Sequence, residues 1–209
     1  MTLNGFNKIA FIYDRLAGIV FGESIKNSQR YFIDRIPAEA KILILGGGTG
    51  WLLAEILMAR PAREIWYVEA SSKMIEKSKG KIPAGSNVYF IHGTENNIPP
   101  DILFDVVITN FYVDLFTDKT LPVVVTKIIS TLHEKSFLLV TDFVDGGKWW
   151  HKAMLKIMYT FFRFTSGIQG NKLPNWNDVF QQHHLKKQAS KLFYSGFIEA
   201  GILVKQDYR

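Results

Sequence analysis

The chain of 209 residues contains no cysteine. This absence excludes disulfides, thiolate zinc sites and cysteine nucleophiles. The sequence also lacks any apolar run of the roughly 18 residues that a membrane-spanning helix needs. Residues Met1–Ala10 contain no basic segment followed by a long apolar stretch, so no signal peptide is predicted. From these absences we expect a cytoplasmic protein.

The composition is that of a globular protein with a basic balance. Hydrophobic residues make up 47% of the chain and aromatic residues 14%, and the formal net charge is +6. This length and apolar content suit one domain with a sizeable core. Basic residues cluster in 73–81 and 186–191, where a solvated helix face and an exposed strand are favoured. Attraction to nucleic acid or to an anionic membrane is the alternative for these clusters.

The middle of the chain alternates short apolar segments with helical ones. Expected strands are Lys41–Leu45, Glu64–Glu69, Asn87–His92, Phe104–Asn110 and Ser136–Asp142. Helices are expected at 51–60, 71–79 and 118–132, with Ser71 as a cap and Pro122 in a first turn. Strands that alternate with helices predict a mostly parallel sheet with helices on both faces, a Rossmann-like α/β fold.

The two ends of the chain follow other patterns. Residues 6–35 predict two helices, separated at Gly22, with Ser24 capping the second. Residues 187–193 and 197–205 predict a hairpin that adds an antiparallel edge and brings the sheet to seven strands. We therefore expect one domain with four parts: an N-terminal helical cap (1–36), a core (40–142), an aromatic-rich helical insertion (146–184) and a terminal hairpin (185–209).

A glycine-rich turn follows the first expected strand. Its sequence, Gly-Gly-Gly-Thr-Gly over residues 46–50, does not match a phosphate loop. A dinucleotide fingerprint that starts at Gly46 would place Trp51 where the third glycine must stand, and the indole would obstruct the pyrophosphate. The spacing of Gly46, Gly48 and Gly50 instead suits a ligand without a pyrophosphate.

An acidic residue ends the second expected strand. Glu69 stands where a carboxylate can accept hydrogen bonds from both hydroxyls of a ribose. The alternative is a surface carboxylate that caps the next helix, because acids favour helix N-termini. A glycine turn and an acid at these two strand ends together indicate a nucleoside site much more strongly than either feature alone.

Four segments together resemble the class I S-adenosylmethionine-dependent methyltransferases. These segments are Ile42–Gly50, Tyr67–Ser71 with Met74, Phe90–Pro99 and Phe104–Asn110. The resemblance covers residues 40–142 well and the terminal hairpin moderately. The opening helix, the insertion and the ending of the chain are loosely similar to the ubiquinone/menaquinone-biosynthesis branch.

The resemblance implies S-adenosylmethionine as the cofactor and assigns residues to it. On the methionine side, these residues are Gly46, Gly48, Gly50, Asn110, Phe111 and Tyr13. On the nucleoside side, Glu69 would bind the ribose and Ala70 or Met74 would pack on the face of the adenine. Thr94 and Glu95 would flank the amino edge of the adenine. Two positions depart from the family pattern, because Ile44 and Thr94 stand where the family often has acids. A catalytically silent relative that only binds the cofactor is therefore an alternative.

The expected acceptor is a small, lipophilic or aromatic molecule. The Asn/Asp-Pro-Pro-Tyr/Phe motif of many amino-group methyltransferases is absent, since the chain reads Asn-Phe-Tyr-Val over 110–113. The insertion supplies apolar residues that either cover an acceptor pocket or pack on the sheet: Met154, Leu155, Met158, Phe161 and Phe162. Only the positive net charge supports the hypothesis of an RNA methyltransferase, so a nucleic-acid partner is disfavoured. Peripheral contact with a membrane is compatible with the sequence.

No catalytic residue and no metal site is predicted. His151 is a candidate proton acceptor, although a structural histidine is favoured because no partner is evident. His183 and His184 are adjacent and would point apart on a helix, so one metal ion is not expected there. The oligomeric state does not follow from the sequence.

Overall fold

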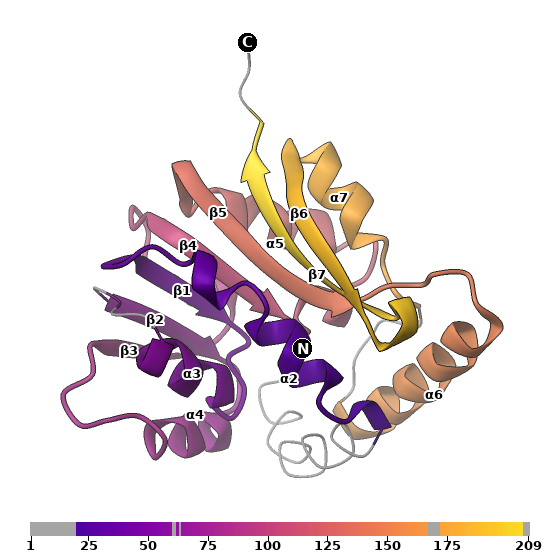
Figure 1. Cartoon of the computed structure of the whole chain (residues 1–209), viewed down its shortest axis with the longest axis horizontal. Helices are drawn as coiled ribbons and strands as arrows, with labels where there is room; N and C mark the ends of the chain where they lie inside the picture. The colour runs from indigo at the N-terminus through magenta and orange to yellow at the C-terminus, as the bar shows by residue number, and fades with distance from the viewer. Residues whose placement is uncertain (1–19, 60–61, 63, 167–171, 207–209) are drawn as a thin grey trace.

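A computed structural model describes residues 20–59, 62, 64–166 and 172–206 of the chain (Figure 1). The seven strands are β1 (Lys41–Leu45), β2 (Glu64–Glu69), β3 (Val88–His92), β4 (Phe104–Asn110), β5 (Leu132–Phe143), β6 (Leu185–Phe193) and β7 (Ile198–Lys205). They form one sheet in the order β3-β2-β1-β4-β5-β7-β6. Only β7 pairs antiparallel with its two neighbours, β5 and β6. The predicted Rossmann-like fold with an antiparallel terminal hairpin is confirmed.

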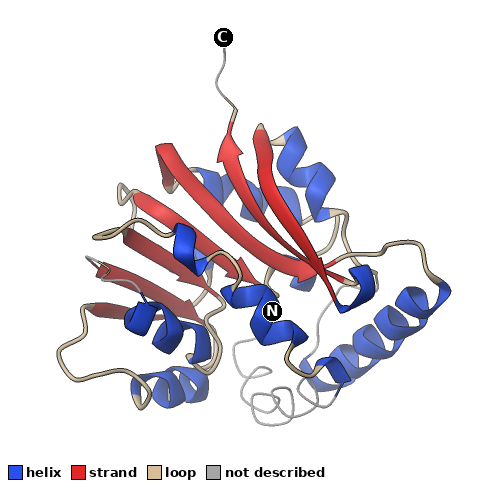
Figure 2. Ribbon diagram, in the orientation of Figure 1, coloured by secondary structure: helices blue, strands red, loops and turns tan. Residues whose placement is uncertain are grey.

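Helices cover both faces of this sheet (Figure 2). They are α2 (Ser24–Arg30), α3 (Trp51–Ala59), α4 (Ser72–Lys79), α5 (Leu121–Ile129), α6 (Trp149–Ser166) and α7 (Trp176–Gln182). Four short 3-10 helices are η1 (Ile33–Arg35), η2 (Glu95–Asn97), η3 (Val113–Leu115) and η4 (Tyr194–Gly196). The helical segment expected before residue 20, with Tyr13, lies outside the described residues.

The strands carry alternate side chains into two cores, as their period of two requires. Leu43 and Leu45 of β1 join a core with α5 and α7 on one face. Ile42 and Ile44 join a core with α3 and η1 on the other face. A third, smaller cluster lies beneath α6 and consists of Phe21, Phe143, Leu155, Tyr159, Phe197 and Ile198. The sheet is therefore buried on both faces along β1, β4 and β5, which leaves its carboxyl edge for a site.

One strand begins earlier than the sequence predicts. β5 starts at Leu132, whereas we expected residues 132–135 to lie outside it, partly in a helix that in fact ends at Ile129. The polar segment is held by its own side chains, because His133 donates its N–H to Ser136 Oγ (3.0 Å) and Ser136 donates to the carbonyl of Phe104 (2.6 Å). Polar residues thus extend the strand where apolar periodicity stops.

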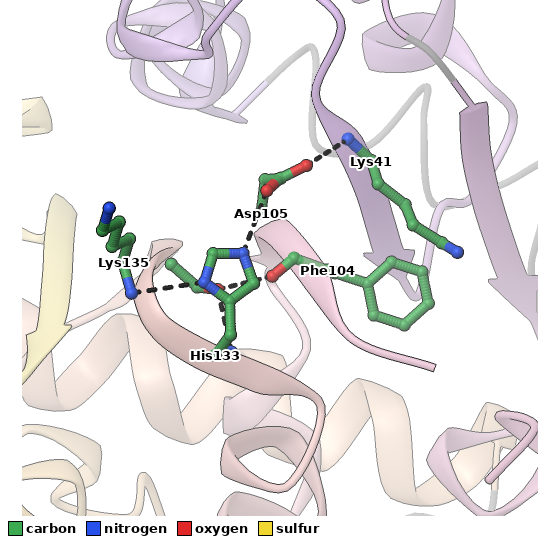
Figure 3. Close-up of polar contacts among 6 residues, drawn as sticks. Lys41, Phe104, Asp105, His133 and Lys135 are labelled. Atoms are coloured by element: carbon green, nitrogen blue, oxygen red, sulfur yellow. Dashed lines mark hydrogen bonds and ion pairs between the residues drawn. The ribbon is translucent and has the colours of Figure 1, made fainter. Parts of the chain in front are cut away.

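The same cluster ties the amino ends of three strands together (Figure 3). Asp105 Oδ2 accepts the backbone N–H of Lys41 at 2.7 Å, and Asp105 Oδ1 lies 2.9 Å from His133 Nε2. Lys135 donates its N–H to His133 Nδ1, which leaves Nε2 as the protonated nitrogen that donates to Asp105. This network lies at the opposite end of the strands from the glycine turn and is structural.

A second correction concerns the helix cap at the N-terminal end of the described chain. Ser24 is the first residue of α2, and the N-cap position is taken by Glu23, which makes no side-chain capping bond. Gly22 does end the preceding helical turn, with a φ of 55°. Gly22 therefore separates the two helical segments as predicted. Ser24, however, is the first residue of the second helix and does not cap it.

Candidate functional site

The glycine turn after β1 bends back against the end of β2. The N–H groups of Gly46 and Gly47 both donate to the carbonyl of Val68, at 3.0 and 3.3 Å. Gly46, Gly48 and Gly50 have φ values of 65°, 66° and 79°, a left-handed conformation that favours glycine. The first two N–H groups of the turn therefore face β2 and are not available to a ligand.

Glu69, the last residue of β2, points its carboxylate at this turn. Its Oε2 accepts the N–H of Gly48 at 2.8 Å, and its Oε1 accepts the N–H of Ser71 at 2.8 Å. The side chain is only 5% exposed, and burial raises the pKa of Glu69 while the backbone donors at Gly48 and Ser71 oppose the rise. Each oxygen retains a further lone pair, so the carboxylate can still accept from two hydroxyl groups.

The space around the turn differs from one glycine to the next. A Cβ on Gly46 would lie 2.6 Å from Cδ2 of Tyr112, and a Cβ on Gly47 would lie 2.1 Å from Cζ of Tyr67. A Cβ on Gly48 would meet no atom within 4 Å. Tyr67 also donates its hydroxyl to the carbonyl of Gly48 at 2.8 Å, which fixes the turn. Gly48 is thus the point of the turn where open space adjoins the Glu69 carboxylate.

This difference gives a matched pair of substitutions. Gly85 also has a positive φ (81°) and open space around a Cβ, but it belongs to the loop before β3. Gly48→Ala and Gly85→Ala should each cost about 1–2 kcal/mol of stability from backbone strain. If a ligand uses the space at Gly48, only Gly48→Ala weakens binding of S-adenosylhomocysteine, by about tenfold or more in calorimetry. Equal affinities for both variants would place the ligand elsewhere.

The segments that follow β2 and β3 lie beside this turn. Ser71 caps α4 by accepting the N–H of Met74 at 3.3 Å, as predicted, and Met74 is 9% exposed. Thr94 is the N-cap of η2, and its hydroxyl accepts the N–H of Asn96. Gly93 donates its N–H to the carbonyl of Glu69 at 3.0 Å, which holds the end of β3 against the end of β2. The residues predicted for the nucleoside side therefore come from adjoining strand ends.

Glu95 has partners within the chain. Its Oε2 accepts the hydroxyl of Tyr112 at 2.6 Å, and its Oε1 accepts the side-chain N–H of Asn96 at 2.9 Å. Tyr112 is 7% exposed, and burial, with the neighbouring Glu95 carboxylate, raises its pKa well above the ordinary value. The neutral phenol therefore spans from the end of β4, past Gly46, to the loop after β3. The sequence offered no signal for this contact.

The end of β4 carries the residues predicted for the methionine side. Asn110 is the last residue of β4, and its Nδ2 is buried without a hydrogen-bond partner among the described residues. Phe111 has a φ of 49° and donates its N–H to the carbonyl of Thr141 at 2.7 Å. This left-handed residue turns the chain sharply off the strand. An unpaired buried amide at a strand end marks a place where a ligand could supply the missing acceptor.

Two buried carboxyl groups lie next to that turn. Asp142, on β5, accepts three backbone N–H groups on Oδ2, from Tyr112, Val113 and Asp114, and accepts Phe143 N–H on Oδ1. Asp114 is 7% exposed, and its Oδ1 has no hydrogen-bond partner among the described residues. Burial raises the pKa of Asp114 to about 7, and burial and the charge of Asp114 raise the pKa of Asp142.

The two carboxyls therefore resist double ionisation near neutral pH, because both are buried and the charge of Asp114 disfavours a charge on Asp142. The backbone N–H groups that donate to Asp142 oppose the rise of its pKa, whereas Oδ1 of Asp114 has no hydrogen-bond partner among the described residues. The sequence analysis missed this pair. The available signal was an acid at or just beyond the carboxyl ends of two neighbouring strands, β4 and β5.

Helix α6 of the insertion packs over the same edge. Tyr159 donates its hydroxyl to the carbonyl of Asp114 at 3.1 Å, and Leu155 and Tyr159 join the cluster beneath α6 with Phe143. Burial raises the pKa of Tyr159, as do the nearby aspartates Asp114 and Asp142. Met154 and Met158 pack against that cluster. Further along, Trp176 and Phe180 of α7 pack into the sheet core, so part of the insertion is core.

The histidines named in the sequence have different settings. His151 is fully buried, and its Nδ1 accepts the N–H of Gly146 at 2.9 Å, so the proton resides on Nε2. Burial lowers the pKa of His151. This position between α6 and the loop after β5 favours the structural role. Within the described part of the chain, no group of three histidine or acidic residues could hold a metal ion. None of the described helices could cross a membrane.

Comparisons with known proteins point to one family. A family model described as a methyltransferase domain matches residues 42–135. The malonyl-acyl-carrier-protein O-methyltransferase of Halalkalibacterium halodurans is 29% identical over 114 residues, which cover 50% of this chain and 41% of that protein. The match thus spans less than half the length of this curated relative.

Solved structures share the fold at low sequence identity. A chain from a complex with a methyltransferase activator of Haloferax volcanii has a TM-score of 0.74 at 11% identity, covering 100% of this chain and 99% of that one. The 1,6-didemethyltoxoflavin-N1-methyltransferase of Burkholderia thailandensis has a TM-score of 0.69 at 11% identity, covering 98% and 88%. The family model over residues 42–135, the curated relative and the strand order of the sheet thus make this chain similar to the class I S-adenosylmethionine-dependent methyltransferases.

Proposed function

We propose that the chain binds S-adenosylmethionine at the carboxyl edge of β1, β2 and β4 and transfers its methyl group to a small acceptor. The observation that carries this proposal is the Glu69 carboxylate, held at 2.8 Å from the N–H of Gly48 beside the open side of the glycine turn. The family match and the fold support the same reaction. The Burkholderia thailandensis neighbour was crystallised with bound S-adenosylhomocysteine, the product of such a transfer.

The residues present fit this cofactor. Glu69 has acceptor capacity left for a ribose diol, Gly48 leaves space that a side chain would fill, and Asn110 has an unpaired buried amide for an acceptor group such as a carboxylate. When bound, the cofactor supplies a methyl group already activated on a sulfonium. The remaining task of the chain is to align the acceptor with that methyl group and to exclude water.

We assign proton removal from the acceptor to Asp114. Its carboxyl group is buried, carries an unpaired Oδ1 and has a pKa of about 7, which suits a base at neutral pH. It follows β4, the strand end beside which the donor methionine is expected. Transfer to oxygen or an acidic carbon would need such a base.

The acceptor we propose is lipophilic or aromatic. Tyr159 and Leu155 of α6, with Phe143 of β5, form an apolar cluster next to Asp114. Phe111 adds a ring 4.9 Å from that of Phe143. Apolar walls with one convergent acid are suited to a phenol or enol, whose acidic hydroxyl needs a base and whose body needs burial. With the domain limits proposed from the sequence (1–36, 40–142, 146–184 and 185–209), Leu155 and Tyr159 belong to the insertion and Phe111 to the core.

Two measurements test the function. Calorimetry should detect binding of S-adenosylmethionine and S-adenosylhomocysteine to the whole chain. Transfer of labelled methyl groups should then be found on a panel of phenols, quinols and β-dicarbonyl compounds. Binding without transfer to any member would favour the silent relative, for which Ile44 and Thr94 are the sequence argument. If the chain binds neither S-adenosylmethionine nor S-adenosylhomocysteine, the proposed function is refuted.

A further inference from the structure

The outer face of α6 is solvent-exposed and unusual in composition. We define it by the exposed residues Trp149, Lys152, Ala153, Lys156, Ile157 and Thr160. Trp149 is 81% exposed and Ile157 66% exposed, although large apolar side chains are usually buried. These residues share one side of the helix, because their spacing follows its period of 3.6. The opposite side, with Leu155 and Tyr159, packs against the cluster beneath the helix.

This face has a single sign of charge. The sequence contains no aspartate or glutamate from Gly146 to Asn177, and Lys152 and Lys156 form no ion pair among the described residues. The lysines flank the exposed tryptophan and isoleucine along the helix. Trp149 and Ile157 are two turns apart, roughly 12 Å along the axis. α6 lies at the margin of the molecule (Figure 1). Among the described residues, its exposed side thus carries an apolar stripe beside lysines that form no ion pair.

We propose that the outer face of α6 docks on an anionic lipid bilayer. A basic helix with tryptophan and aliphatic residues on its exposed side is suited to lie in a membrane interface, where the rings reach the acyl boundary and the lysines meet anionic headgroups. Nucleic acid is the weaker match, because the face offers an aliphatic side chain beside the tryptophan where single strands are bound by successive stacking aromatics. Positive charge fits either anionic partner, and the exposed aliphatic side chain beside the tryptophan selects lipid.

Such docking goes beyond the proposed function and does not rest on it. It would bring the acceptor side of the domain to the membrane, because the buried side of the same helix meets Asp114 through Tyr159. A lipophilic acceptor could then pass from the bilayer to the edge of the sheet without crossing water. The lipid-facing surface and the proposed acceptor wall lie on opposite sides of one helix.

The experiment is sedimentation of the full chain with vesicles, without cofactor. Vesicles of phosphatidylcholine with about 30% phosphatidylglycerol, an anionic lipid, are compared with vesicles of phosphatidylcholine alone. We expect binding to the anionic vesicles, at least about tenfold weaker binding to neutral ones, and weakening as salt is raised. Lys152→Glu with Lys156→Glu should reduce binding by at least about 25-fold, at roughly 1 kcal/mol for each lysine lost.

Two further variants separate the surface from general charge. Trp149→Ala should reduce binding by about tenfold, since an indole no longer enters the interface. Lys73→Glu with Lys77→Glu makes the same charge change on exposed positions of α4 and should leave binding within about threefold. The proposal is overturned if the chain ignores anionic vesicles, if both charge pairs weaken binding equally, or if Trp149→Ala has no effect. Because cofactor is absent throughout, failure here leaves methyl transfer untouched.

Discussion

Replacing Glu69 with alanine should weaken binding of S-adenosylhomocysteine by at least about 100-fold. Two hydrogen bonds from a ribose diol to a carboxylate contribute about 1.5–3 kcal/mol each, and 3 kcal/mol corresponds to roughly two decades in affinity. The alanine also frees the N–H groups of Gly48 and Ser71, which now donate to the carboxylate at 2.8 Å. Isothermal titration on the purified variant measures the effect.

Two companion variants keep this prediction sharp. Glu69→Gln preserves one carbonyl acceptor, so it should lose less affinity than alanine and retain more of the fold of the turn. Glu76→Gln removes a charge from an exposed position on α4 and should leave the affinity unchanged. If the alanine variant is folded and still binds as tightly as the unmodified chain, the ribose is not held by Glu69.

Replacing Asp114 with asparagine should lower the rate of methyl transfer by about 100-fold to 10,000-fold, the contribution expected of a positioned base. Cofactor affinity should stay within a few-fold, because Asp114 acts on the acceptor. The amide keeps the size and polarity of the side chain but cannot accept a proton. Single-turnover transfer from labelled S-adenosylmethionine, measured beside calorimetric affinity, separates the two effects.

The pH dependence gives a second readout for the same residue. With a pKa of about 7, Asp114 is protonated at pH 6 and ionised at pH 8, so transfer by the unmodified chain should rise through pH 7. The Asp114→Asn variant should lack this rise. A rise that persists unchanged in the variant would assign the base to another group.

Stability should change with pH in the opposite direction. Because the pKa of Asp114 is raised from 3.8 to about 7 in the folded chain, the folded state binds more protons than the unfolded state between these values. The free energy of unfolding therefore falls as pH rises from about 4 to about 7. In the Asp114→Asn variant, the free energy of unfolding should decrease less over this pH range. The variant should therefore be more stable than the unmodified chain at pH 8. Thermal unfolding at several pH values measures it.

Much of the sheet could be predicted because its strands bury both faces. β1, β2 and β4 begin and end at the predicted residues, since each is a mostly apolar run that ends at a glycine, an acid or an asparagine. The start of β5 was missed because Leu132 is followed by polar residues. His133 and Ser136 extend the strand through side-chain bonds to β4, and such long-range bonds leave no periodic signal in the sequence.

The candidate site divides in the same way. Glu69 and the glycine turn could be predicted because their roles depend on local position at two strand ends. The Tyr112–Glu95 bond and the Asp114–Asp142 pair were missed, because each joins residues from separate segments that only the folded sheet brings together.

The most direct test is a crystal structure of the chain grown with S-adenosylhomocysteine. We expect the two ribose hydroxyls within hydrogen-bonding distance of the Glu69 carboxylate and ligand atoms in van der Waals contact with Gly48. Density for the ligand at another edge of the sheet, or a Glu69 that contacts only Gly48 and Ser71 while the ligand is bound, would contradict the nucleoside site.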